Sequence, residues 1–526
     1  RNPNQNNIAL VNNNRHRISN STVTAADSIV VIAMNRLFLL VCFALLVAAI
    51  LAEQPEDFLS LGDDALASDK LNEAILFYNK GIQLLVPQES SLITSISLHT
   101  NLGTSLSSLG QDTEAAEAYR RALQFYDDEI QDVGEKSVKV DATGIAAQAS
   151  FFLGMVYQEL EENEKAANAY AYANTLDPLH WSSLANLGAV LKDQLKQVDD
   201  SLVAYNKAYE ILAQKDVEPT DAPEHPEFVL AELQYRIGYI IMENPERKCA
   251  VTDKPDAEVQ CEEFANHAFA LALKYHPEHE AAKHMLATLT ADATMKRASN
   301  TYIKSLFDGY AQNFEHSLVA ELGYNGYQRL RRAFDRAFRM EPPTFDIVVD
   351  AGCGTGLVGE QFRNISQYLI GVDLSEAILL EAQKARPNLY DEVLVGDVTE
   401  VFLEKSPISL ITAADSYIYF GDLEPLFDSM QKGLKEGGYA AFTLENVDKD
   451  NEKVLATSKP DWRWQLTASG RFAHNREYVQ DMGVAHDLHL FHYEPLDNFR
   501  YEGGMGVRGH IFIMQKRTTA AKKDEL

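Results

Sequence analysis

Residues 345–362, FDIVVDAGCGTGLVGEQF, decide the fold of the C-terminal half of the chain. Apolar and β-branched residues lead into Asp350, and an amphipathic run begins at Leu357, so a strand, a tight turn and a helix are expected in succession. The turn holds three glycines at alternate positions: Gly352, Gly354 and Gly356. Glycines let a backbone approach a bulky ligand, and the amides that open the next helix point outward. Because a dinucleotide-binding loop reads G-x-G-x-x-G, the spacing here favours a smaller, adenosyl ligand.

Four more strands are expected downstream, and the first three of them end in a carboxylate. Residues 366–373, SQYLIGVD, end at Asp373, about 20 residues past the glycines, where ribose hydroxyls need a hydrogen-bond acceptor. The next strand ends at Asp397 and the one after it at Asp415. A glycine turn and a further strand fill residues 434–445, and an antiparallel pair of strands is expected near the end of the domain.

This ordered set resembles the class I S-adenosylmethionine-dependent methyltransferases. The resemblance implies a Rossmann-like α/β domain over residues 300–517, with a seven-stranded, mostly parallel sheet, and S-adenosyl-L-methionine as cofactor. In that family the acidic residue and the glycines of the loop hold the methionine end, the next carboxylate holds the ribose, and the third faces the adenine. The residues that the resemblance assigns to the cofactor are Asp350, Gly352, Gly354, Gly356, Asp373, Asp397 and Val398.

Helical repeats are expected N-terminal to this domain, over residues 55–295. Gly154 and Gly188 are one 34-residue tetratricopeptide period apart, and Tyr170 and Ala173 stand where the second helix of such a repeat needs them. About five copies are expected, with an insertion in the fifth and a closing helix at residues 280–295. A solenoid of this kind presents a concave face that usually holds a peptide or a protein segment.

The segment between the repeats and the glycine loop has the form F-D-x-Y-A-x-x-F. It is similar to segments that precede the cofactor fold in methyltransferases with tetratricopeptide repeats, where such a segment covers the cofactor. The resemblance therefore implies a cofactor contact for Tyr310, and a packed helix is the alternative. Candidate catalytic bases are His474, Asp415 and Tyr419, because they follow strands or lie in loops near the expected crevice.

Both ends of the chain carry targeting patterns. Residues 1–33 are rich in Asn and are expected to be disordered upstream sequence. Residues 34–52 combine a short basic head with an apolar run and a small final residue, which predicts a signal peptide, with a signal anchor as the alternative. Residues 518–526 form a tail that ends in Lys-Asp-Glu-Leu, an address read by a retention receptor. Together the two patterns predict a protein of the endoplasmic reticulum lumen with no membrane span in its mature form. The alternative is that both patterns occur by chance, in which case the protein is cytosolic.

Composition restricts the partners and the redox chemistry. A formal net charge of -30 repels phosphate backbones, so no nucleic-acid partner is expected.

Cys249 and Cys261 are candidates for a disulfide in an oxidising lumen, with two free thiols as the alternative, and Cys353 is expected to be a packed residue. No cluster has the spacing of a metal site, so no metal is expected. Asn364 begins a glycosylation sequon.

Two functions are compatible with these features. The first is a lumenal S-adenosylmethionine-dependent methyltransferase whose repeats present or recruit a protein or small-molecule acceptor. The second is a non-catalytic scaffold, similar to a cochaperone, with a vestigial methyltransferase fold. The complete set of expected cofactor residues favours the enzyme.

Overall fold

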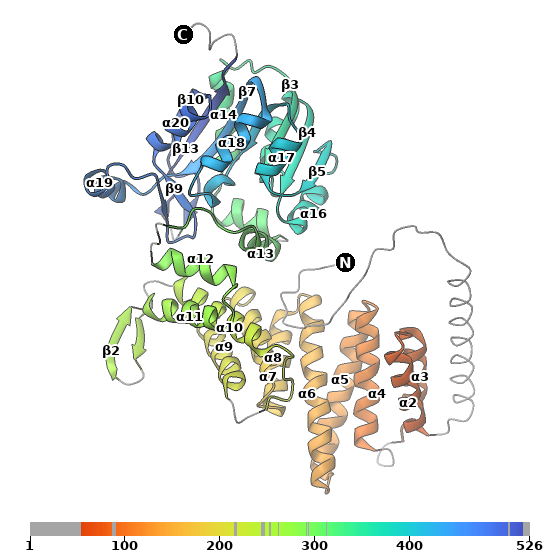
Figure 1. Cartoon of the computed structure of the whole chain (residues 1–526). Coiled ribbons are helices and arrows are strands. Elements are labelled where there is room, and N and C mark those ends of the chain that lie inside the picture. The colour runs from red at the N-terminus through yellow and green to blue at the C-terminus, as the bar shows by residue number, and fades with distance from the viewer. Residues whose placement is uncertain are drawn as a thin grey trace, which may run out of the picture. The chain divides into compact units, whose positions relative to one another are not determined.

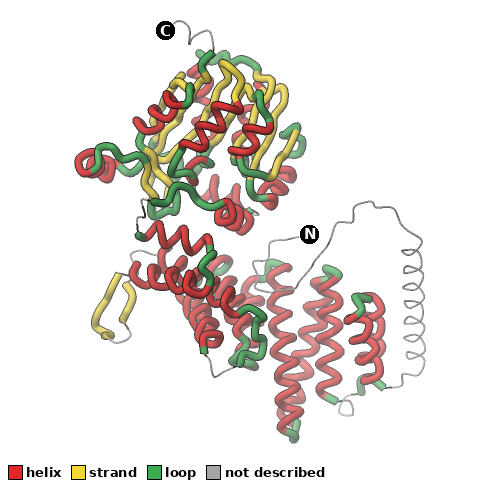
Figure 2. Tube along the Cα trace, viewed as in Figure 1, coloured by secondary structure: helices red, strands yellow, loops and turns green. Residues whose placement is uncertain are grey.

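A computed structural model describes residues 54–518, apart from 87–90, 215–217, 244–247, 252–253, 261, 291, 293, 312 and 503–504. The described chain forms two compact units that separate between His276 and Pro277 (Figure 1). The first is all helical except for one hairpin, and the second combines helices with a large sheet (Figure 2). The expected signal peptide and the Lys-Asp-Glu-Leu terminus lie outside the described residues.

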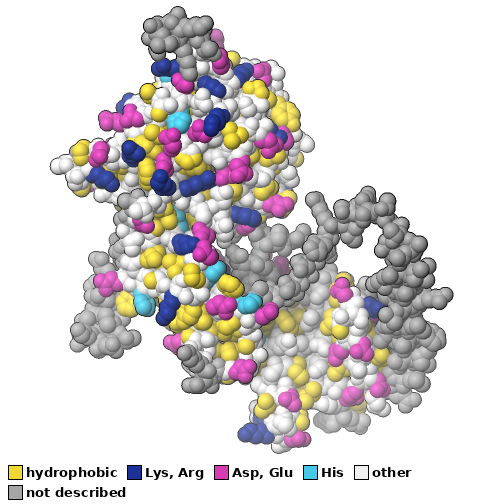
Figure 3. Space-filling model, viewed as in Figure 1, with side chains coloured by type: hydrophobic (Ala, Val, Ile, Leu, Met, Phe, Trp, Pro, Cys, Tyr) yellow, Lys and Arg dark blue, Asp and Glu magenta, His cyan; other side chains and the backbone are white. Residues whose placement is uncertain are grey.

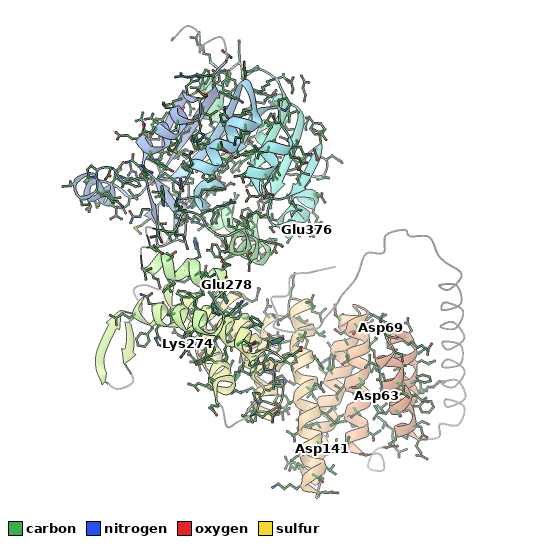
Figure 4. All side chains as sticks on the ribbon, viewed as in Figure 1. Asp63, Asp69, Asp141, Lys274, Glu278 and Glu376 are labelled. Atoms are coloured by element: carbon green, nitrogen blue, oxygen red, sulfur yellow. The ribbon has the colours of Figure 1, made fainter. Side chains whose placement is uncertain are left out.

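The first unit consists of helices that pack in consecutive pairs, as the repeat spacing predicted. The pairs are α2 (Pro55–Ala67) with α3 (Leu71–Gln83), α4 (Leu92–Ser108) with α5 (Asp112–Glu129), α6 (Lys136–Glu159) with α7 (Asn163–Leu176), α8 (Trp181–Asp193) with α9 (Val198–Ala213), and α10 (Pro226–Met242) with α11 (Glu262–Tyr275). Polar contacts supplement the apolar core: Asp63, labelled in Figure 4, accepts hydrogen bonds from Tyr78 and Asn101, each at 2.8 Å. This carboxylate therefore joins α2 to α3 and to α4.

Each helix pair packs an aromatic ring against a glycine of the partner helix. A Cβ added at any of these glycines would lie only 2.2 to 3.0 Å from the nearest ring atom. The five pairs are Gly62 with Tyr78, Gly103 with Tyr119, Gly154 with Tyr170, Gly188 with Tyr205, and Gly238 with Phe269. The rings are buried, so the contact lets two helices approach closely while a large apolar surface leaves water. The contact between a glycine and an aromatic ring thus explains why both residue types recur at fixed positions in each repeat.

Replacing Gly154 by alanine is expected to lower the stability of the repeat unit by roughly 1–3 kcal/mol, because the new methyl group overlaps the ring of Tyr170. Gly144, also on α6, is the matched control, since a Cβ there meets no atom within 4 Å. Alanine at Gly144 is expected to raise stability by up to about 1 kcal/mol through helix propensity. Unfolding midpoints followed by circular dichroism test the pair, and equal midpoints for both variants would contradict the close packing.

The insertion in the fifth repeat contains a short hairpin. Strands β1 (Lys248–Val251) and β2 (Lys254–Gln260) pair antiparallel between α10 and α11. Cys261 and the side chain of Cys249 lie outside the described residues, so their disulfide stays a prediction.

The second unit is built on a sheet with the strand order β10-β13-β7-β6-β3-β4-β5. The strands are β3 (Phe345–Ala351), β4 (Ser366–Asp373), β5 (Glu392–Val395), β6 (Ile408–Ala413), β7 (Leu434–Glu445), β10 (Leu488–Leu496) and β13 (Gly509–Lys516). The first five are parallel, and β13 runs antiparallel to both β7 and β10. This confirms the expected mostly parallel sheet with an antiparallel closure. The sheet also includes β8 (Trp464–Leu466) and β9 (Phe472–His474), a hairpin that the sequence did not predict.

Helices cover both faces of this sheet (Figure 1), which explains why its strands read as continuous apolar runs. Every residue of β6 is buried. One core includes residues of α14 (Gly326–Ala337) and α15 (Leu357–Phe362), and the other includes residues of α17 (Val398–Glu404), α18 (Glu424–Gly433) and α20 (Arg476–Ala485). Helices α16 (Glu376–Ala385) and α19 (Lys449–Ser458) complete the unit. Figure 3 shows acidic and basic side chains interspersed over the visible face of the second unit, with fewer basic ones on that of the first.

Helix α12 (Glu280–Leu289) belongs to this second unit, whereas the sequence analysis placed it at the end of the repeats. His284 on α12 is buried, and its Nε2 lies 2.7 Å from the carbonyl oxygen of Gly470 in the β8–β9 hairpin. The same imidazole stacks on Tyr302, with ring centroids 4.3 Å apart. These contacts are between residues far apart in sequence, so the helical pattern of residues 280–295 could not show which unit α12 joins.

Candidate active site

A pocket opens at the carboxyl ends of β3, β4, β5 and β6, which is where open α/β sheets bind ligands. Its lining combines the glycine loop, the residues after each strand and the segment that precedes α14. The lining residues are Arg297, Ile303, Phe307, Phe314, Leu318, Tyr324, Gly352, Cys353, Gly354, Thr355, Leu357, Val358, Asp373, Leu374, Gly396, Val398, Ala414, Asp415, Ser416, Ile418, Tyr419, Phe420 and Arg471.

The glycine loop has the backbone that its sequence predicted. Gly352, Gly354 and Gly356 have φ values of +69°, +53° and +95°, a region that residues with a Cβ rarely adopt. A Cβ at Gly352 would lie 2.1 Å from Oγ of Ser416. Gly352 and Gly354 line the pocket, but Gly356 does not: it is the N-cap of α15, and a Cβ there would meet Leu389. The first two glycines therefore shape the pocket wall, while the third makes the turn into the helix.

Asp373 lies at the end of β4 and lines the pocket. Its two carboxylate oxygens accept the backbone N–H groups of Gly354 and Ser375, each at 3.0 Å. Burial raises the pKa of this carboxyl, and the hydrogen bonds from these amides act in the opposite direction. The carboxylate thus fixes the glycine loop and faces the pocket with acceptor capacity still available, as a ribose diol requires.

Asp350 is buried beneath the loop and is not among the lining residues. Its Oδ2 accepts a hydrogen bond of 2.7 Å from the hydroxyl of Tyr390. Burial raises the pKa of Asp350 to about 7, although hydrogen bonds from Tyr390, Gly359 and Thr412 oppose the shift. The structure therefore gives Asp350 a supporting position behind the glycines instead of the ligand contact that the resemblance implied.

The raised pKa of Asp350 makes a testable contribution to pH-dependent stability. A carboxyl with an ordinary pKa of 3.8 that rises to about 7 on folding stabilises the folded state below pH 3.8, and this contribution is lost as the pH rises through 7. Asp350→Asn cannot titrate, so its stability relative to the wild type is expected to improve by roughly 1–3 kcal/mol between pH 5 and pH 8. Denaturant unfolding at both pH values measures the difference, and parallel pH profiles for the two proteins would contradict this assignment.

Asp397, after β5, is the N-cap of α17 and is engaged on both carboxylate oxygens. Oδ1 accepts from the backbone N–H and the hydroxyl of Thr399, at 2.9 and 2.7 Å, and Oδ2 accepts from Arg297 at 2.6 Å and from Asn300 at 2.9 Å. Burial alone would raise the pKa of Asp397, but these hydrogen bonds and the charge of Arg297 lower it. Its neighbours Gly396 and Val398 line the pocket, whereas Asp397 itself does not. Val398 therefore lines the pocket, and its contact with the cofactor stays a prediction.

The segment before α14 covers the pocket, and we call residues 300–321, apart from 312, the lid. It contains α13 (Asn300–Tyr310) and the short π-helix η2 (His316–Glu321). Phe314 lies over the glycine loop, with a ring atom 3.3 Å from the position of a Cβ at Gly354, and packs edge to face on Phe307. Both rings line the pocket. The aromatic face of the lid thus excludes water from the glycine loop.

The structure does not support the cofactor contact expected for Tyr310. Its side chain is 44% exposed and is not among the lining residues. Phe307 and Phe314 line the pocket where a contact from this tyrosine was expected.

Ion pairs and hydrogen bonds hold the lid against the two ends of α16 (Glu376–Ala385), whose caps are Ser375 and Arg386. The hydroxyl of Ser375 donates to Asp308 at 2.5 Å, and Arg386 forms a bidentate pair with Glu315, at 2.7 and 2.9 Å. Arg386 also donates to the carbonyl of Thr355 in the glycine loop, at 3.1 Å. These contacts connect the lid directly to the loop that it covers.

Asp415 and Tyr419 follow β6 and line the pocket two strands along the sheet from Asp373, which ends β4, and Arg471 from the β8–β9 hairpin lines it as well. Asp415 has a φ of +58°, a strained value for a non-glycine residue, and its Oδ2 accepts from the guanidinium of Arg500. Arg500 is fully buried and also donates to Glu445 and Glu502. The strain and the buried arginine together fix Asp415 at the pocket wall.

His474 does not lie in the pocket, so its placement does not support the catalytic role proposed from sequence. It is fully buried in β9, with Nε2 3.2 Å from the carbonyl oxygen of Gly421. Burial lowers its pKa to about 3, so the imidazole is neutral and has no access to a ligand. The RFAH segment instead places Arg471, three residues earlier, at the pocket.

Three arginines of the site were missed from sequence: Arg297, Arg471 and Arg500. Each is tied to a carboxylate far away in the chain, Arg297 to Asp397, Arg471 to Glu502 and Arg500 to Asp415. Such pairs join distant parts of the sequence, so no local pattern shows them. Among the described residues, no group of His, Cys, Asp and Glu side chains is arranged to hold a metal ion. In the same part of the chain no helix is long and apolar enough to cross a bilayer.

Asn364 lies in the 3-10 helix η3 (Arg363–Ile365), where its Oδ1 accepts a hydrogen bond of 2.7 Å from Arg331. The side chain is exposed, and glycosylation there stays a prediction.

The residues of the pocket fit an adenosyl sulfonium cofactor. Gly352 and Gly354 line the pocket with backbone that carries no Cβ, Asp373 offers a buried acceptor for hydroxyl groups, and apolar lid residues cover the loop. No lysine occurs in the described lining, and its glycine loop has the alternate spacing G-x-G-x-G instead of the dinucleotide spacing G-x-G-x-x-G.

Comparisons with known proteins agree with this assignment. Residues 348–438 match the family model described as "Methyltransferase domain", and residues 96–128 match a tetratricopeptide repeat. Two curated relatives are malonyl-[acyl-carrier protein] O-methyltransferases. The one from Enterobacter lignolyticus is 26% identical over 127 residues, which cover 24% of this chain and 50% of that protein. The one from Hamiltonella defensa is 25% identical over 173 residues, which cover 32% of this chain and 61% of that protein. The chain thus spans between half and two thirds of the curated relatives it matches.

Solved structures are also similar to part of this chain. An S-adenosylmethionine-dependent methyltransferase from Clostridium acetobutylicum is 17% identical, with 39% of this chain and 99% of that chain covered and a TM-score of 0.29. Magnesium protoporphyrin IX methyltransferase from Synechocystis, solved with bound SAH, is 12% identical. The match covers 42% of this chain and 100% of that chain, with a TM-score of 0.31. From the family match, the chain carries an S-adenosylmethionine-dependent methyltransferase domain with a tetratricopeptide repeat N-terminal to it.

Proposed function

We propose that the whole protein is an active S-adenosylmethionine-dependent methyltransferase. The observation that carries the proposal is the cradle of Gly352 and Gly354, with Asp373 at its edge and Phe307 and Phe314 over it. When bound, the cofactor supplies a methyl group activated by a sulfonium. The chain contributes alignment of the acceptor and exclusion of water, which are the main requirements of an in-line methyl transfer.

Each part of the pocket has a proposed role in holding the cofactor. The amides of the glycine loop and the start of α15 would face the methionine end, and Asp373 would accept from the ribose hydroxyls. Gly396 and Val398 lie where the adenine would pack. Asp415 and Tyr419 then remain at the other end of the pocket, where they would face the acceptor.

The repeats would recruit the acceptor or a protein that carries it. Tetratricopeptide solenoids bind peptide segments on their concave face. The two curated relatives act, by their names, on a malonyl group attached to a carrier protein, so an acceptor delivered on a protein has a precedent among similar methyltransferases. We place a protein or peptide segment first among the candidate partners.

We also propose that the enzyme works in the lumen of the endoplasmic reticulum, with a retention receptor as a second partner. Residues 34–52 have the pattern of a signal peptide, and the chain ends in Lys523, Asp524, Glu525 and Leu526. Protease protection in microsomes tests this: the full chain should be resistant until detergent is added, and truncation of the last four residues should cause secretion. Digestion without detergent would place it in the cytosol.

The activity is tested with purified full-length protein, S-adenosylmethionine labelled in the methyl group, and a microsomal extract as the source of acceptors. Transfer of label into protein or into small solutes is the expected result. Saturable binding of the cofactor without any transfer would instead favour the scaffold.

A further inference from the structure

The pocket has an end that the proposed cofactor site does not use. It is formed by the residues after β6 and by the β8–β9 hairpin. Its polar side chains are those of Asp415, Tyr419 and Arg471, and its walls include Phe307 and Phe420. The acceptor must bind here, because the glycine loop, Asp373 and Val398 line the other end.

Two of these polar side chains are hydrogen-bond donors. Arg471 donates a hydrogen bond through Nη1 to Glu502. It also interacts with the phenol of Tyr419, through its charge and through a side-chain hydrogen bond. Burial raises the pKa of Tyr419 above its ordinary value, with Arg471 opposing the shift, so the phenol stays protonated at neutral pH. Arg471 therefore has further N–H groups beside the O–H of Tyr419. The two side chains together can donate hydrogen bonds to both oxygens of a carboxylate.

The described lining of this end holds one carboxylate that could take a proton from the acceptor, Asp415, whose Oδ1 has no hydrogen-bond partner. Neither histidine nor lysine occurs among the described lining residues, and His474 is buried outside the pocket. Asp415 has its Oδ2 engaged by Arg500, which itself is bound to two more carboxylates. An amine or an alcohol has to lose a proton when it is methylated, whereas a carboxylate is already deprotonated at neutral pH.

We infer that this end of the pocket binds a carboxylate through Arg471 and Tyr419, and that the methyl group is transferred to a carboxylate oxygen. The inference rests on the proposed function and names its acceptor class. An oxygen lone pair forms the new bond to the methyl carbon while the bond from that carbon to sulfur breaks, and sulfur keeps the electron pair. The products are a methyl ester and the neutral thioether, and no proton changes place.

A binding experiment tests the acceptor class without turnover. Full-length protein saturated with S-adenosylhomocysteine is titrated calorimetrically with phenylacetate, 2-phenylethanol and phenethylamine, which share an aromatic body and differ in the reacting group. A peptide with a free C-terminal carboxylate and its amidated form distinguish a polypeptide source from a small acid. Phenylacetate or the free peptide should bind, and the alcohol, amine and amide should bind at least roughly tenfold more weakly, because they leave the donors unpaired.

Variants of the donors separate recognition from folding. Arg471→Met and Tyr419→Phe should each weaken carboxylate binding by roughly tenfold or more, with affinity for S-adenosylhomocysteine retained. Arg463→Met is the matched control, since Arg463 precedes the same hairpin, is exposed and lies outside the described lining. Equal affinity of all three variants for the carboxylate would overturn the inference, as would preferential binding of the amine or the alcohol.

The chemistry of the product gives an independent readout. Label transferred from the methyl-labelled donor to phenylacetate, to the peptide or to a microsomal extract should be released as volatile methanol by mild alkali, as methyl esters are. Label that resists alkali would overturn the carboxylate inference and leave the methyltransferase intact. Protein that binds the donor but labels none of these acceptors also contradicts the inference, and protein that does not bind the donor at all contradicts the proposed function with it.

Discussion

Replacing Asp373 by alanine is expected to weaken the binding of S-adenosylmethionine by roughly 10- to 100-fold, because a hydrogen bond to a charged acceptor contributes about 1.5–3 kcal/mol. Two effects combine in this variant. The ribose hydroxyls lose their acceptor, and the amides of Gly354 and Ser375 lose the carboxylate that positions them. Isothermal titration of the purified variant with the cofactor measures the loss.

Glu381→Ala is the control for this experiment. Glu381 lies on α16, close in sequence to Asp373, and pairs with the exposed Lys384 away from the described pocket lining. Its substitution should change cofactor affinity by less than about twofold, because exposed pairs contribute little. An Asp373→Ala protein that is folded and binds the cofactor like the wild type would remove Asp373 from the site.

Replacing Arg500 by methionine is expected to destabilise the α/β unit by roughly 3–5 kcal/mol, the usual cost of breaking a buried ion pair. Arg500 is fully buried, and three carboxylates converge on it: Asp415, Glu445 and Glu502. Burial raises the pKa of Glu445, and Arg500 counteracts that shift. Without the guanidinium, the buried carboxylates must either take up protons or repel one another.

The stability of this variant is compared with that of Lys435→Met, in which an exposed pair with Asp346 is lost. Denaturant unfolding should show a change within about 0.5 kcal/mol for Lys435→Met, because surface ion pairs contribute little. The loss in Arg500→Met should be smaller at pH 4 than at pH 8, since protonation relieves the unpaired carboxylates. An Arg500→Met protein as stable as Lys435→Met would mean that the carboxylates do not depend on Arg500.

Local patterns predicted the elements of this protein that depend on local physics. The pairing of Gly154 with Tyr170 follows from a helix-to-helix contact that recurs with each repeat, so its spacing is visible in sequence. The alternate glycines after Asp350 require positive φ, and Asp373 ends a strand whose last five residues are buried. Each of these features can be identified within a window of about 35 residues.

Features that depend on tertiary contacts were missed or misplaced. The aromatic residues of the lid lie at helical spacing, but sequence cannot say which face meets the pocket, and the structure turns Phe307 and Phe314 inward and Tyr310 outward. Arg500 reaches Asp415 across 85 positions of sequence. His474 was chosen for the ordinary pKa of histidine, and only its complete burial in β9 shows that this pKa does not apply.

The central claim is that the glycine loop, Asp373 and the lid form a site for an adenosyl sulfonium. Isothermal titration of wild-type, full-length protein with S-adenosylmethionine, and with NAD as the comparison ligand, tests it most directly. The account predicts saturable one-site binding of S-adenosylmethionine and no binding of NAD. Folded protein that gives no heat with S-adenosylmethionine at millimolar concentration would contradict it.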